Sequence, residues 1–317
     1  MSVDRGEHWT EVHERGDVVG MRFLYAAYRL LGRWAFSLML YPVAAYFCLT
    51  AGPARRASQE YFLAVRRRLE ELGRPPPSAL TLFNSFREFG RSVLDKGAMW
   101  AGTFPSANVE FDDREIFTRI RESGRGALFI GSHLGNLEVL RAYGDAKQGL
   151  KVNALVFSRS APKLNRIAAT IGPRAFHRMI QIESLGPESV MQLQDKIRAG
   201  EHVAIAADRV SVRHSNRSIH VPFLGRPAPF PEGPFILASL LACPVYLIFC
   251  LAEGKHYRVF IEQFADPLIL PRGHRHETLE RVITQYAQRL ESYCLRAPTQ
   301  WFNFFNFWGP AGGDRVK

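Results

Sequence analysis

A histidine and a glutamate lie five residues apart in the stretch GALFIGSHLGNLEVLRAYG, and together these residue types can move a proton. His133 follows a β-rich run that ends near Ser132, and Glu138 stands at the start of a helical pattern. A tight turn between them would let the carboxylate hold one ring nitrogen of the imidazole and leave the other free to accept a proton. We therefore expect His133 to act as a general base on a hydroxyl, assisted by Glu138. A purely structural histidine is the alternative interpretation.

Motifs for several other chemistries do not occur in the sequence. It has no G-x-S-x-G elbow, no G-x-G-x-x-G and no G-x-x-x-x-G-K-[ST]. The cysteines lie far apart in apolar surroundings and have no histidine at ligand spacing, so reduced core thiols are predicted at Cys48, Cys243, Cys250 and Cys294. We expect a direct transfer without a covalent enzyme intermediate, and neither a metal nor a redox cofactor.

The elements that must position the histidine follow from the hydrophobic pattern after Val109. Short β-rich runs alternate there with amphipathic helical patterns, which predicts parallel strands joined by crossover helices. The expected fold class is α/β, with a mostly parallel central sheet flanked by helices and a helical, partly membrane-associated N-terminal extension. Strands are predicted at 126–132, 151–157, 179–183, 202–207, 218–223, 245–251 and 257–262. Helices are predicted near 136–147, 162–171, 187–199, 232–242 and 275–296.

The N-terminal third has a different pattern, so we divide the chain into a polar segment at 1–20, a helical region at 21–105 and an α/β body at 106–317. Residues 34–51 are almost uncharged and approach the length of a bilayer span. Their cationic and aromatic flanks fit a helix that spans the membrane or one that lies in a single leaflet, and a buried core helix is the alternative. Ser58 is a predicted N-cap for the next helix, and a further helix is predicted over 80–100.

Composition and charge narrow the class of protein. Of the 317 residues, 47% are hydrophobic and 22% are charged, which excludes low-complexity disorder and a multi-span membrane architecture. Lysine and arginine exceed the acidic residues by 11, which favours an anionic partner such as lipid headgroups, nucleic acid or an acidic carrier protein. The polar start is unlike a secretory signal, so we expect the protein in the cytosol or on its membrane.

Several blocks of the sequence, taken in order, resemble a known family. SHLGNLE matches the motif H-x-x-x-x-[DE] of the glycerolipid acyltransferase superfamily, and the later blocks FSRSAPKLNRIAATIG, AIAADR and VPFLGRPAPFPEGPFILASLLACPVYLIF follow, with APTQWFNFFNFW at the close. Together they resemble the late acyltransferases of lipid A biosynthesis, the lauroyl and myristoyl types. The resemblance covers roughly residues 20–310.

The resemblance implies an O-acyltransferase that moves an acyl group from acyl carrier protein, or from coenzyme A, to a hydroxyl of a lipid or glycolipid. It places the enzyme on the cytoplasmic face of the bacterial inner membrane. Arg159 matches a functional arginine and Asp208 a functional aspartate, and with Arg209 they are the substrate-binding residues that we expect. The tetrahedral oxyanion of such a reaction would need donors from the helix N-terminus or nearby backbone amides.

Departures from the family pattern keep other functions open. Lipid A enzymes usually carry an Asp-Gln-Asp type sequence where this chain has Asp208-Arg209-Val210, and the N-terminal region is similar to a branch associated with aryl-polyene synthesis. An aryl-polyene-type acceptor is therefore one alternative. An esterase or thioesterase in which His133 activates water is a second. Nucleic-acid binding is a distant third, since the arginines are scattered without a recognition motif, and we expect no nucleic-acid partner.

Overall fold

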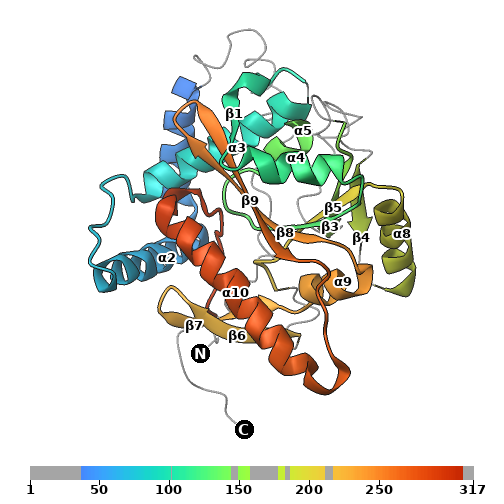
Figure 1. The fold of residues 1–317 in the computed structure, drawn as a ribbon. Coiled ribbons are helices and arrows are strands. Elements are labelled where there is room, and N and C mark those ends of the chain that lie inside the picture. The colour runs from blue at the N-terminus through green and yellow to red at the C-terminus, as the bar shows by residue number, and fades with distance from the viewer. Residues whose placement is uncertain are drawn as a thin grey trace.

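A seven-stranded β-sheet runs through the computed structural model, which describes residues 37–100, 102–143, 149–157, 178–182, 186–210 and 217–309 (Figure 1). Its strand order is β1-β9-β8-β2-β5-β3-β4. The strands are β1 (Val109–Phe111), β2 (Leu128–Gly131), β3 (Val152–Phe157), β4 (Met179–Ile182), β5 (His202–Ala206), β8 (Val245–Glu253) and β9 (His256–Ala265). The five strands from β8 to β4 are parallel, which confirms the predicted α/β class with a mostly parallel sheet.

Two parts of the β structure differ from the sequence prediction. β9 returns antiparallel to β8 through a tight turn, because Gly254 at positive φ permits a hairpin where no crossover helix intervenes. The predicted strand at 218–223 is present as β6 (Ser218–Phe223), but it pairs only with β7 (Arg226–Pro231) in a separate two-stranded sheet. β7 was not predicted, because its sequence RPAPFP is rich in proline, a residue that lacks the amide hydrogen of a regular ladder.

Helices cover both faces of the sheet. They are the Ser37–Thr50 helix, α2 (Gly52–Glu71), α3 (Leu82–Trp100), α4 (Arg114–Glu122), α5 (Glu138–Tyr143), α8 (Pro187–Arg198), α9 (Gly233–Leu241) and α10 (Arg275–Arg296). The prediction for 275–296 is confirmed at both ends, and those for 187–199 and 232–242 agree within one residue at each end. Ser58 is not an N-cap: α2 begins at Gly52 with a proline in its first turn, and Ser58 is buried inside the helix. The helix predicted at 162–171 lies outside the described residues.

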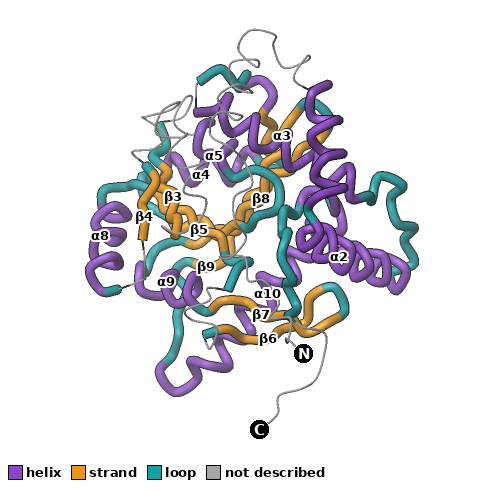
Figure 2. Tube along the Cα trace, turned by 180° about the vertical axis from the view of Figure 1, so that it is seen from behind, coloured by secondary structure: helices purple, strands orange, loops and turns teal. Residues whose placement is uncertain are grey.

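The two faces of the sheet carry separate hydrophobic clusters, because side chains alternate along each strand. On β2, Leu128 and Ile130 join the cluster with α2, α8, α9 and α10, whereas Phe129 joins the cluster with α4. On β8, Phe249 and Cys250 divide in the same way. Figures 1 and 2 show α4 and α5 on one side of the sheet and α9 and α10 on the other. The carboxyl ends of the central strands lie between these layers.

The N-terminal helices bear on the question of a membrane segment. Within the described part of the chain, no single helix combines the length and apolar composition needed to cross a bilayer. The Ser37–Thr50 helix and α2 have the required length and apolar composition only when they are taken together. The chain bends by 94° between them, at Ala51.

Candidate active site

The His133 turn connects the end of β2 to the start of α5. Gly135 in this turn has φ +71°, and a Cβ at this position would collide with the Cys250 carbonyl of β8. Only glycine fits there. The Asn136 side chain accepts a hydrogen bond from the Glu138 amide at 3.3 Å and so caps α5. The turn therefore packs against β8, and both Gly135 and the Asn136 cap define its backbone conformation.

The C-terminal aromatic segment holds the same turn from the other side. The Gly135 amide donates to the Gln300 carbonyl at 2.9 Å, and the Phe302 amide donates to the His133 carbonyl at 3.1 Å. Leu134 and Trp301 form an antiparallel bridge. Trp301, in the closing block APTQWFNFFNFW, lies in the core, 2% exposed. This segment also forms one wall of the His133 turn.

Asp208 is the carboxylate that holds the His133 ring. Its Oδ1 lies 2.7 Å from Nδ1 of the ring, and its Oδ2 accepts from the His133 amide at 2.8 Å. A third donor, Nε1 of Trp301, reaches the same Oδ2 at 2.9 Å. The register explains the meeting: Gly131 of β2 pairs with Ala206 of β5, so His133 and Asp208 both stand two residues past the ends of adjacent parallel strands.

The charges around this pair determine which ring nitrogen is free. Burial alone would raise the pKa of Asp208, but its contacts with His133 and the Arg209 charge outweigh burial and lower the pKa to about 2. An ionised Asp208 accepts a hydrogen bond from Nδ1–H of the ring, so Nε2 of a neutral ring has a free lone pair. Burial and Arg209 lower the pKa of His133 below its ordinary 6.5. The ring is therefore neutral at pH 7, and its side chain is 36% exposed, which leaves room for a reacting group.

Glu138 has other partners than the one predicted. Its Oε2 accepts from Nε1 of Trp100 at 2.9 Å and from the guanidinium of Arg141 at 2.7 Å. Among the described residues we find no hydrogen bond between Glu138 and His133, and the Nδ1 position that we expected Glu138 to take belongs to Asp208. The reason is directional: α5 begins at Glu138 and turns its side chain toward α3. Burial by itself would raise the pKa of Glu138, but Arg141, Lys96 and Trp100 lower it.

Of the predicted substrate-binding residues, Asp208 and Arg209 lie beside His133, and Arg159 lies outside the described residues. Arg209 donates from Nη2 to the Phe302 carbonyl at 3.1 Å, and its guanidinium lies 5.6 Å from the centre of the Phe305 ring. Burial lowers the pKa of Arg209 to about 10. Arg209 is thus fixed in the wall of the site.

Sequence reasoning missed three residues of this site: Lys96, Trp100 and Trp301. Lys96 and Trp100 come from α3, for which the sequence predicted a helix over 80–100 but no functional residue. A lysine inside a helix that otherwise packs against the body, four residues before a tryptophan, was the available signal for α3. Burial lowers the pKa of Lys96, and Arg209 adds to this effect while Glu138 opposes it.

A histidine and an aspartate thus stand at the carboxyl ends of two adjacent parallel strands of an α/β sheet, the edge at which active sites of this fold class lie. The comparison with family models gives the class of the protein: residues 84–309, more than two thirds of the chain, match the model for bacterial lipid A biosynthesis acyltransferases. The chain belongs to this family, and the protein is an acyltransferase. None of the curated proteins compared with it matches.

Proposed function

We propose that the protein transfers an acyl group from a thioester of acyl carrier protein or coenzyme A to a hydroxyl of a membrane lipid or glycolipid, with His133 as the general base. One observation carries the proposal. Asp208 binds Nδ1 of His133 at 2.7 Å, which leaves Nε2 of a partly exposed, neutral imidazole as proton acceptor.

In the proposed reaction, Nε2 of His133 removes the proton of the acceptor hydroxyl as its oxygen attacks the thioester carbonyl carbon. The new C–O bond forms and the carbonyl π electrons move onto oxygen. The intermediate then collapses, the C–S bond breaks, and the thiolate takes the proton from the imidazolium. Asp208 stays ionised throughout and stabilises the imidazolium. Asp208 thus performs the orienting role that sequence analysis assigned to Glu138.

Glu138 acts in this proposal as a fixed negative charge at the edge of the site. It is anchored by Arg141, whose side chain is only 4% exposed, and by the Trp100 indole. A carboxylate whose charge is balanced by an ion pair and a hydrogen bond is a poor proton acceptor. Its contribution to the reaction is the electrostatic support of its neighbour Lys96.

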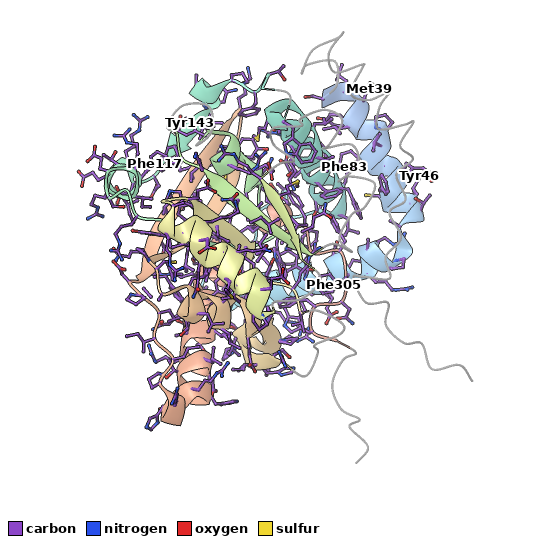
Figure 3. All side chains as sticks on the ribbon, turned by 90° about the vertical axis from the view of Figure 1, so that its right-hand side faces the viewer. Met39, Tyr46, Phe83, Phe117, Tyr143 and Phe305 are labelled. Carbon is purple, nitrogen blue, oxygen red and sulfur yellow. The ribbon has the colours of Figure 1, made fainter. Side chains whose placement is uncertain are left out.

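The outer face of the Ser37–Thr50 helix supports contact with a membrane surface. Its inner face carries Leu40 and Ala44, which are buried, while large apolar side chains on the other face stay exposed. Leu38, Tyr41, Tyr46 and Leu49 are between 48% and 78% exposed. Figure 3 shows Tyr46 at the edge of the molecule, with Phe83 of α3 between this helix and the body. A helix with its larger apolar residues facing outward has the composition of an interfacial helix.

The reaction is tested by mass spectrometry of lipids from bacteria that express the wild type, His133→Ala or His220→Ala at equal abundance. His220 is an exposed histidine on β6 and serves as the matched control. We expect a lipid with an added acyl mass in the wild type and the control and none in His133→Ala. Identical profiles with a folded wild type would reject the proposal, and release of free fatty acid without an acylated acceptor would indicate a hydrolase.

Membrane contact is tested by flotation with vesicles of phosphatidylethanolamine and phosphatidylglycerol. We expect the double substitution Leu38→Ser and Leu49→Ser to reduce the fraction of protein that floats. Leu240→Ser is the control, because Leu240 is 50% exposed but lies on α9. Equal flotation of the double variant and the control would reject this part of the proposal.

A further inference from the structure

The oxyanion of acyl transfer needs hydrogen-bond donors or positive charge, and the backbone of the His133 turn is already occupied. Sequence analysis expected donors from this turn or from the start of α5. The amides of His133 to Asn136 and of Glu138 donate to Asp208 Oδ2, Ser132 Oγ, the Gln300 carbonyl, the Cys250 carbonyl and Asn136 Oδ1. Apart from Leu137, the described amides of this turn are therefore already bonded, which leaves the cationic side chains described around the turn as candidate donors.

Lys96 is the cation that α3 places over this turn. Ser92, Lys96 and Trp100 are spaced at i, i+4 and i+8, so they share one stripe of the helix. Both ends of the stripe touch the turn: the Ser92 carbonyl accepts from the Asn136 side chain at 3.3 Å, and Trp100 donates to Glu138. Lys96 lies between these two contacts and is half-buried.

The ammonium of Lys96 is the positive charge of the site that is least used by the protein itself. Arg141 is bound to Glu138, and Arg209 is bound to the Phe302 carbonyl beside Asp208. Among the described residues, no hydrogen bond or ion pair of the Lys96 ammonium is found. It interacts at longer range with His133, Glu138 and Arg209. A half-buried cation without a close partner, beside a general base, is suited to a negative charge that develops only during the reaction.

We propose that Lys96 is a catalytic residue whose ammonium group stabilises the oxyanion of the tetrahedral intermediate. The inference rests on the proposed acyl transfer, in which the former carbonyl oxygen gains one negative charge as the C–O bond forms and loses it as the C–S bond breaks. Lys96 neither gives nor takes a proton in this scheme. It is poised for the charge of the intermediate rather than for the uncharged thioester, so its effect falls on the rate of the chemical step.

The test compares Lys96→Met, which keeps the length of the side chain, with Lys96→Arg, which keeps the charge. Lys255→Met is the control, because Lys255 is exposed in the β8–β9 turn. The probes are dodecanoyl thioesters of acyl carrier protein and of coenzyme A, with a total lipid extract of a Gram-negative bacterium as acceptor. We expect Lys96→Met to lower kcat about 10²- to 10³-fold with KM for the thioester nearly unchanged, and Lys96→Arg to retain more activity. Lys255→Met should match the wild type.

Several outcomes separate this inference from the proposed function. If the wild type transfers no acyl group, the proposed function fails. If the wild type is active and Lys96→Met keeps its kcat, the oxyanion role of Lys96 fails alone. A rise in KM with unchanged kcat would instead assign Lys96 to ground-state binding, and equal losses in Lys96→Met and Lys96→Arg would indicate packing; either result overturns the inference. Thermal unfolding verifies that each variant is folded.

The pH dependence of kcat/KM is a second measurement, and it would not change if Lys96 only contributed packing. Lys96 and Arg209 lower the pKa of His133 and Asp208 raises it, with burial as the largest cause of the net decrease. Removing the Lys96 charge should therefore raise the pKa of His133 and move the acidic limb of kcat/KM to higher pH. An unchanged limb would contradict a position of Lys96 beside the base.

Discussion

Two carboxylates lie near the His133 turn, and their surroundings share several features. Asp208 is 1% exposed and Glu138 is 12% exposed, and each accepts a hydrogen bond of 2.9 Å from a tryptophan indole, Trp301 and Trp100 respectively. In both cases neighbouring charges lower the pKa against the effect of burial. The difference is that Asp208 binds an imidazole, whereas Glu138 binds the guanidinium of Arg141.

In the proposed reaction, this difference couples Asp208, and not Glu138, to proton transfer. The imidazole of His133 can gain a proton near neutral pH, so the charge that faces Asp208 changes during a reaction. A guanidinium does not exchange its proton near neutral pH, so Glu138 is held in a fixed ion pair with Arg141. Proximity in sequence pointed to Glu138, and the geometry points to Asp208.

The largest expected effect comes from Asp208→Asn. The amide of asparagine can donate to Nδ1, which favours the wrong ring tautomer and removes the charge that stabilises the imidazolium. We expect kcat/KM for acyl transfer to fall about 10²- to 10⁴-fold, with the fold retained in circular dichroism. A folded Asp208→Asn enzyme with wild-type activity would break the comparison, because His133 would then not depend on this carboxylate.

Glu138→Ala is expected to act first on stability. It leaves the Arg141 guanidinium, 4% exposed, without its counter-ion. Breaking one side of a buried ion pair costs about 3–5 kcal/mol, which urea unfolding would measure. Glu71→Ala, which removes an exposed partner of Arg68, should cost at most about 1 kcal/mol. Equal costs for the two variants would show that the Glu138 pair is not a structural anchor.

Substituting Trp301 or Trp100 by phenylalanine tests the same comparison through the loss of a single hydrogen bond to each carboxylate. Trp301→Phe removes a hydrogen bond to the Asp208 carboxylate, a contact worth about 1.5–3 kcal/mol, or roughly ten- to a hundredfold in rate if it fixes His133. Trp100→Phe should reduce stability and alter the pH profile less. Trp308→Phe is the control for loss of indole volume, because its Nε1 has no partner within the described chain. The measurement is kcat/KM as a function of pH for all three variants, and a Trp308→Phe enzyme as slow as Trp301→Phe would indicate packing alone.

The smallest expected effect is a shift of the pH profile. Protonation of His133 abolishes its role as a base, so kcat/KM of the wild type should fall on the acidic side, with a limb below pH 6.5 because burial and Arg209 lower the pKa of His133. Asp208 raises this pKa, so the residual activity of Asp208→Asn should have its limb at still lower pH. Glu138→Gln should move the limb little. A limb above pH 6.5 in the wild type would contradict the neutral ring that we describe.

The pKa values of Asp208 and His133 also predict that the folded protein loses stability as the pH falls. The folded-state pKa of Asp208 is about 2, below its ordinary 3.8, so its contribution to stability is present above about pH 3.8 and is lost as the pH falls toward 2. The lowered pKa of His133 acts in the same direction, since the unfolded chain takes up this proton below pH 6.5.

Local patterns predicted most of the fold. The periodicity of residues 275–296 and the β-rich runs of β2, β3, β4, β5 and β8 identified elements that are present within a few residues of the expected bounds. The β6–β7 hairpin and the antiparallel return of β9 were missed, because pairing partners depend on contacts between distant segments. For the same reason, Lys96 and Trp301 were not connected with His133: they approach it from α3 and from the C-terminal segment.

The sequence by itself determined the turn between β2 and α5 that carries His133, because the positive φ of Gly135 and the cap that Asn136 provides for α5 are local features. It also predicted Asp208 and Arg209 as substrate-binding residues, through a resemblance that the match at 84–309 confirms at the level of the family, and both lie beside His133. Only the tertiary structure decided which carboxylate holds the imidazole. The register of β2 against β5 brings Asp208 to Nδ1, while the first turn of α5 directs Glu138 to Arg141. His133 and Glu138 are close in sequence and belong to the same turn. The hydrogen-bond partner of His133, however, depends on the packing of strands that are far apart in the chain.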